Sequence, residues 1–335
     1  MFNNSHNLIK REQTYILKRI PVSIHSEDRD INKWPNSNNF EICLPSVYEN
    51  IQSIRLIQIS FPNKLYVFSN NYKNTLLKFS IVNVNTKYSY TIYIEEGTYT
   101  PDELAGELLT KIRNIAIDDI ADLDFIVSYN KIQNKFYFES NKEFKFIFDE
   151  TSKFVNPVNY NCSSLINVYE QYINWGLGSY LGFNKRNYDS IQKPSDSRYY
   201  LNTDNCINIF GDTNFYMEID KCNSYDEIYP YNTQTNSYYN NTYGGKCKSA
   251  FAKIPINNII DSDYSYKTII GSKSLYGFTN FEPPLEKLSK FRFSFRYHDG
   301  RLVDFKNQQF NFTIEINTLS NEIGKYFKVR TPEIL

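Results

Sequence analysis

The strongest constraint on the fold is a strict two-residue alternation of aromatic and polar side chains between Leu288 and Tyr297. Aromatic residues occupy every second position from Phe291 to Tyr297, and Arg292, Ser294 and Arg296 lie between them. Successive side chains of a β-strand point to opposite faces of a sheet, whereas a helix would spread these residues around its axis. The segment is therefore predicted to be a strand with one aromatic face.

The same period recurs along the chain and predicts a mainly β fold. Strand-like runs occupy Phe40–Leu44, Ile51–Phe61, Leu77–Ile81, Tyr88–Ile94, Phe125–Tyr129, Lys135–Glu139, Phe144–Phe148, Cys206–Phe210, Phe215–Ile219, Ala250–Ile256 and Phe310–Ile316. Pro45 and Pro62 are expected to end the first two runs, and Asp299-Gly300 favours a type I′ hairpin. We predict an antiparallel, jelly-roll-like β-sandwich; the sequence leaves open whether there are one or two sandwiches.

One segment changes to helical spacing. Thr100 is a suitable N-cap, Pro101 suits the first helical position, and two acidic residues follow in the first turn. Leu104, Leu108 and Ile112 then recur at helical spacing. The sequence therefore predicts one α-helix near residues 101–113.

The domain organisation follows from shifts in composition. Residues 1–20 are polar and are expected to form an N-terminal arm, and 21–183 are expected to form a β-rich region with the helix. Residues 184–249 are rich in Tyr and Asn and predict a loop-rich insertion. Residues 250–335 return to strands and are expected to form a C-terminal β region that could complete the same sandwich.

Charge and cysteine usage exclude several function classes. Lys+Arg and Asp+Glu both number 37, so the chain lacks the basic excess of a protein that binds nucleic acid through phosphates. The five cysteines form no C-x-x-C pair, as expected of reduced thiols. No run approaches the roughly 18 apolar residues of a membrane-spanning helix, and the N-terminal segment does not resemble a signal peptide.

The residues give little support for catalysis. Neither a metalloprotease, nucleophile-elbow nor Walker motif is present, and His6, His25 and His298 are the only histidines. The acidic pairs Glu95-Glu96, Asp118-Asp119 and Asp226-Glu227 are expected by chance among 37 acidic residues, and Asp28-Arg29-Asp30 suggests a turn with a local ion pair. We therefore predict no catalytic, cofactor-binding or metal-binding residues and no enzymatic activity.

Aromatic residues are the best candidates for partner contacts. Tyr offers a large contact area at a small entropic cost, and it is abundant in the loop-rich insertion. The predicted contact residues are Trp34, Tyr225, Tyr229, Tyr231, Tyr238, Tyr239 and Tyr243. Ordinary loop packing is the alternative explanation for these tyrosines.

Three blocks, taken in order, resemble the minor capsid and capsid-associated proteins of large nucleocytoplasmic DNA viruses, the giant viruses. The first block begins at Ser23 with SIHSEDRDINKWPNSNNFEICLPSVYENIQSIRLIQISFPN. The second begins at Tyr90 with YTIYIEEGTYTPDELAGELLTKI and continues through FIVSYNKIQNKFYFES to the LGF at Leu181. The third begins at Phe281 with FEPPLEKLSKFRFSFRYHDGRLVDFKNQQFNFTIEI. Residues 184–249 lie outside the likeness.

The resemblance implies a structural virion protein. Its expected partners are the major capsid protein and other minor capsid proteins, with no specific nucleic acid, no cofactor and no transmembrane segment; inner-membrane contact and self-association stay open. Its expected location is the inner face of the capsid shell, assembled in the host cytoplasm. A glycan-binding or fibre-type β-sandwich module is the alternative, and a β-fold hydrolase is a weaker one.

Overall fold

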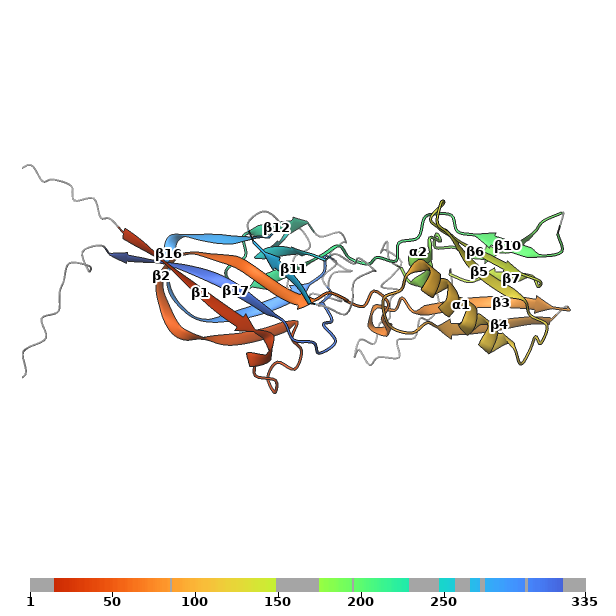
Figure 1. The fold of residues 1–335 in the computed structure, drawn as a ribbon, viewed down its shortest axis with the longest axis horizontal. Helices are drawn as coiled ribbons and strands as arrows, with labels where there is room; N and C mark the ends of the chain where they lie inside the picture. The colour runs from red at the N-terminus through yellow and green to blue at the C-terminus, as the bar shows by residue number, and fades with distance from the viewer. Residues whose placement is uncertain are drawn as a thin grey trace, which may run out of the picture.

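A computed structural model describes residues 15–84, 86–148, 175–194, 196–228, 247–256, 266–271, 275–298 and 301–321. These residues are mainly β-stranded, with antiparallel sheets, as the sequence predicted. Their buried apolar side chains form two clusters, which correspond to the two ends of the elongated molecule in Figure 1. One cluster runs from Val22 to Leu65 and resumes at Phe215. The other runs from Val67 to Ile209.

We call the first unit the terminal lobe and the second the inserted lobe, because the chain enters the second between Leu65 and Val67 and leaves it between Ile209 and Phe215. The described residues therefore have two cores. The boundaries expected at residues 20, 183 and 249 stay a prediction.

The terminal lobe is built on one large curved sheet. Over the described residues this sheet has seven strands: β1 (Tyr15–His25), β17 (Asn311–Asn321), β2 (Asn39–Pro62), β16 (Tyr276–Arg296), β11 (Asn214–Ile219), β14 (Ala252–Pro255) and β15 (Tyr266–Ile270). A hairpin of β12 (Tyr225–Ile228) and β13 (Cys247–Ala250) lies beside it, and the short helix η1 (Ser26–Asp28) follows β1.

The long strands β2 and β16 carry the aromatic core that the alternation predicted. Phe291, Phe293 and Phe295 are buried, and the Phe293 ring lies 5.4 Å from Phe40 on β2 and 4.8 Å from Phe312 on β17. On the opposite face Arg296 is only 1% exposed, and its Nε donates to Glu218 Oε1 over 2.9 Å.

Two strand predictions need correction. Pro45 does not end β2, because it falls in a stretch where the pairing with β16 shifts register between Cys43 and Tyr48; an irregular stretch tolerates proline. Residues Cys206–Phe210 belong to no strand, because Ile207 and Asn208 donate their N–H groups to the carbonyls of Asn134 and Tyr180. The Asp299-Gly300 turn lies outside the described residues.

The inserted lobe is a sandwich of two sheets, each with four strands in the described ranges. One sheet contains β4 (Thr86–Tyr93), β3 (Leu76–Asn83), β7 (Phe144–Phe146) and β8 (Tyr188–Asp189). The other contains β5 (Phe125–Asn130), β6 (Lys135–Ser140), β10 (Tyr199–Asn202) and β9 (Ile191–Gln192). Phe138 of one sheet meets Phe146 of the other edge-to-face at 4.8 Å. The short helices η2 (Asn70–Tyr72) and α2 (Leu177–Leu181) complete the lobe.

The predicted helix is confirmed as α1 (Pro101–Ala116), which extends three residues beyond the expected end. The Thr100 side chain accepts from the Glu103 N–H, and the Glu103 side chain accepts from the Thr100 N–H, so the start is a capping box. Leu104, Leu108 and Ile112 are fully buried, so the helix packs on the inserted lobe through one face.

Replacing Thr100 by Ala removes the cap and should lower the free energy of unfolding by about 1 kcal/mol. Chemical denaturation followed by circular dichroism measures the change. Thr110→Ala is the matched control, because Thr110 lies within α1 and its hydroxyl donates to the Gly106 carbonyl rather than capping an end. Equal losses in the two variants would contradict the role assigned to the cap.

Candidate functional site

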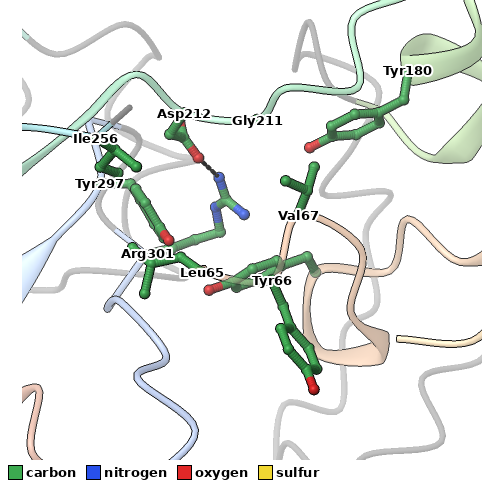
Figure 2. Close-up of a pocket in the computed structure, with 10 residues that line it drawn as sticks. Leu65, Tyr66, Val67, Tyr180, Gly211, Asp212, Ile256, Tyr297 and Arg301 are labelled. Atoms are coloured by element: carbon green, nitrogen blue, oxygen red, sulfur yellow. Dashed lines mark hydrogen bonds and ion pairs between the residues drawn. The ribbon is translucent and has the colours of Figure 1, made fainter. Parts of the chain in front are cut away.

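The two lobes meet in a cluster of aromatic and charged side chains. Arg301 lies between β16 and β17, and its Nη2 donates to Asp212 Oδ2 over 3.1 Å, as Figure 2 shows. The Arg301 guanidinium also lies over the rings of Tyr72, at 4.4 Å, and Tyr297, at 5.2 Å. These two rings meet edge-to-face at 6.3 Å. The contact matters because Tyr72 belongs to η2 of the inserted lobe, yet packs against the core of the terminal lobe.

A second cross-lobe contact is an ion pair. Lys306 Nζ, from the segment before β17, lies 3.0 Å from Glu96 Oε2 and over the Tyr66 ring at 4.7 Å. Glu96 follows β4, and its other carboxylate oxygen accepts from the Asn70 N–H and the Ser69 hydroxyl. We call Tyr72, Glu96, Asp212, Tyr297, Arg301 and Lys306 the inter-lobe clasp.

The pKa shifts within the clasp favour a neutral Tyr72, a charged Glu96 and a charged Lys306. Burial raises the pKa of Tyr72 to about 12, so the phenol stays neutral at physiological pH. Burial alone would raise the pKa of Glu96, but hydrogen bonds from Asn70, Lys306 and Ser69 outweigh it and hold that pKa below its ordinary value. Burial would lower the pKa of Lys306, but the carboxylates of Glu96 and Asp304 outweigh it and raise that pKa.

The pocket between the lobes is too small for a substrate. It is lined by Leu65, Tyr66, Val67, Tyr72, Tyr180, Gly211, Asp212, Ile256, Tyr297 and Arg301, and its cavity volume is about 10 Å³ (Figure 2). That is room for one water molecule at most, whereas small-molecule sites measure about 300–1,000 Å³. The arrangement is suited to holding two lobes together rather than to chemistry.

Among the acidic pairs, Glu95 and Glu96 have different partners, and the Glu227 side chain lies outside the described residues. Glu95 lies near Lys111 Nζ, at 3.4 Å, while its neighbour Glu96 belongs to the clasp. Asp119 accepts a hydrogen bond from the Tyr90 hydroxyl. Within the described ranges no three His, Cys, Asp or Glu side chains are grouped as metal ligands. In the same ranges no helix is long and apolar enough to cross a bilayer.

Trp34 lies in a loop that is tied together by a buried arginine. Arg29 is 6% exposed and donates to the carbonyls of Ser26, Trp34 and Pro35 and to Gln309 Oε1. The expected local ion pair in this turn is thus replaced by hydrogen bonds to carbonyl and amide oxygens. The Trp34 ring is half-buried against the terminal-lobe core, with the Arg292 guanidinium 5.0 Å from its centre. Trp34 therefore has a packing role besides any contact with a partner.

Tyr225 belongs to a row of aromatic rings that runs from buried Tyr216 to exposed Tyr276. Its ring lies 6.4 Å from Tyr216 and 6.2 Å from Tyr276, and Tyr216 lies 6.1 Å from the His298 ring. Tyr276 is 63% exposed, so one end of this aromatic row is open to solvent. Tyr229, Tyr231, Tyr238, Tyr239 and Tyr243 lie outside the described residues.

Sequence reasoning missed the clasp altogether. Its members come from the short helix η2 and from loops, and Lys306 and Glu96 are 210 residues apart in the chain. Loop residues carry no periodicity, so no sequence pattern could have identified them as partners.

The inter-lobe ion pair should be measurable by a double-mutant cycle. Glu96→Gln, Lys306→Met and the double variant should give a coupling free energy of about 1 kcal/mol at pH 7 in urea unfolding. The contribution of Glu96 to the free energy of unfolding is fully present above its ordinary pKa of 4.5. It is lost as the pH falls through the lower pKa that Glu96 has in the folded state. The coupling should therefore shrink in acid.

The exposed pair of Lys287 and Glu49, 3.5 Å apart within the terminal-lobe sheet, is the matched control. Glu49→Gln and Lys287→Met should give a coupling close to zero, since both side chains are well solvated. A coupling for Glu96 and Lys306 no larger than this control would contradict the clasp.

The comparison with known proteins finds a distant structural similarity. No protein-family model and no curated protein matches it. Among solved structures, it is similar to the crystal structure of mavirus penton protein, with a TM-score of 0.40 and 11% sequence identity. That similarity covers 90% of this chain and 99% of the penton chain.

Proposed function

We propose that the chain is a structural protein of a virus particle, a minor capsid component that binds the major capsid protein and neighbouring minor capsid proteins. The observation that carries the proposal is how the three capsid-like blocks assemble. The first block supplies β2, the third supplies most of β16 and β17, and β2 pairs with both of these strands. Arg29 of the first block also donates to Gln309 of the third.

The second block supplies the inserted lobe with β4, α1, β5 and β6. The likeness therefore follows the two structural units, although its blocks are far apart in the sequence. If the likeness reflected only local strand and turn patterns, there would be no reason for the first and third blocks to pair with each other. The proposal assigns no enzymatic activity, cofactor or metal.

In this role the clasped lobes act as a rigid spacer, and affinity comes from aromatic anchors. The contact residues are those predicted from the sequence, Trp34 and the tyrosines from Tyr225 to Tyr243. The exposed end of the aromatic row adds Tyr276 to this surface. Each contact is modest, but a shell repeats it many times, so the total attachment becomes strong. The proposed location is the inner face of the shell, after assembly in the host cytoplasm.

The test replaces Tyr225, Tyr229, Tyr231, Tyr238, Tyr239 and Tyr243 together by Ser. Incorporation into particles, measured by mass spectrometry against the major capsid protein, should fall by about tenfold or more, because aromatic anchors carry most interface energy. Tyr93→Ser is the control, since Tyr93 is 53% exposed on the inserted lobe, away from this surface.

Thermal melting must show that the Ser variant still folds. Unchanged incorporation would overturn the contact assignment. If the chain is absent from particles and binds glycans on a glycan array, the glycan-binding alternative would replace the capsid role.

A further inference from the structure

The described strands of the inserted lobe pair only with one another. Its two sheets contain strands from β3 to β10, and no ladder among the described residues joins them to the terminal-lobe sheet. Two of the ladders, β3 with β4 and β5 with β6, connect strands that follow each other in the sequence. Contacts between near neighbours lose little loop-closure entropy and form fast. The inserted lobe therefore does not need the terminal lobe to form its sheets.

The terminal lobe has the opposite property. Its central strand β2 pairs with β16 and β17, which follow the inserted lobe in the chain. At the end of β2, the Phe61 ring meets the Phe215 ring of β11 edge-to-face at 5.0 Å. The whole inserted lobe lies between these two phenylalanines in the sequence. In an unfolded chain, bringing them together closes a long loop, and the entropy lost grows with loop length.

The folded inserted lobe holds its own two ends side by side. Val67 lies at the entry to the lobe and Gly211 at the exit, and a Cβ added to Gly211 would lie 2.9 Å from the Val67 side chain (Figure 2). Gly211 also has a left-handed backbone, with a φ of 70°. Glycine is suited to both the close approach and this conformation.

Hydrogen bonds within the inserted lobe hold each end in place. At the entry, Phe68 and Gly97 exchange two backbone hydrogen bonds, each 2.9 Å long. At the exit, the Asn208 N–H donates to the Tyr180 carbonyl, also over 2.9 Å. None of these bonds uses a strand of the terminal lobe. The ends of the inserted lobe are therefore positioned by that lobe itself.

We propose that the inserted lobe folds first and serves as the template on which the terminal lobe closes. Once this lobe is folded, only the short segments beside Val67 and Gly211 separate it from the end of β2 and the start of β11. Less entropy is then lost in bringing Phe61 to Phe215. The last strands of the chain, β16 and β17, complete the terminal lobe by pairing with β2.

The two tryptophans of the chain report on the two lobes separately. Trp34 packs against the terminal-lobe core, and Trp175 packs against the inserted-lobe core, 5.3 Å from the Phe148 ring. In Trp34→Phe the remaining tryptophan follows the inserted lobe, and in Trp175→Phe it follows the terminal lobe. Stopped-flow refolding of the full chain from urea should show the Trp175 signal changing before the Trp34 signal.

The order is tested further by weakening each core in turn, in both single-tryptophan backgrounds. Phe138→Leu removes volume from the inserted-lobe core, and Phe293→Leu is the matched change in the terminal lobe, since both rings are fully buried. At a urea concentration where Trp175 shows that about one-tenth of the Phe138→Leu inserted lobe is folded, the Trp34 phase should be about tenfold slower than in the parent. Phe293→Leu should leave the rate of the Trp175 phase unchanged.

A Trp34 signal that changes first, or one common phase for both tryptophans, would overturn the proposal. So would an unchanged Trp34 rate in Phe138→Leu at that urea concentration. Circular dichroism shows whether each variant is folded before denaturation. Thr100→Ala, which weakens α1 of the same lobe more mildly, replaces Phe138→Leu if that variant does not fold. The inference does not depend on the capsid role, since refolding is measured with the purified chain alone.

Discussion

The structure depends on the pairing of β2 with strands from the far end of the chain. One edge of β2 pairs with β16 and then with β15, and the other edge pairs with β17. These ladders join residues that are more than 200 positions apart, so the terminal lobe cannot form until both ends of the chain have met. Buried Phe side chains on β2, β16 and β17 compensate for the entropy lost in closing so large a loop.

The same pairing explains why the inserted lobe is held at both ends. The chain leaves β2 at Pro62, builds a second core, and returns to β11. Two covalent crossings alone would leave the lobes free to swing. The clasp joins them, because Tyr72 reaches the terminal-lobe core, Arg301 lies over the rings of Tyr72 and Tyr297, and Lys306 pairs with Glu96.

Local features of the fold were predictable from the sequence, and long-range ones were not. The strand period around Phe293 and the capping residue Thr100 act over a few residues, so pattern alone identified a strand and a helix. Pairing partners depend on distant segments, which is why the sequence could not decide between one sandwich and two. The sequence predicts Trp34 and Tyr225 as partner contacts, which stays a prediction, and it could not indicate their neighbours Arg292 and Tyr276.

We propose that this chain is a structural component inside a virus shell. Cryo-electron microscopy of particles made by the source tests it most directly, by locating the density of the chain. The expected result is two-lobed density on the inner face of the shell, with the surface around Tyr225 against neighbouring subunits. Density confined to external fibres, or no density in the particles, would contradict it.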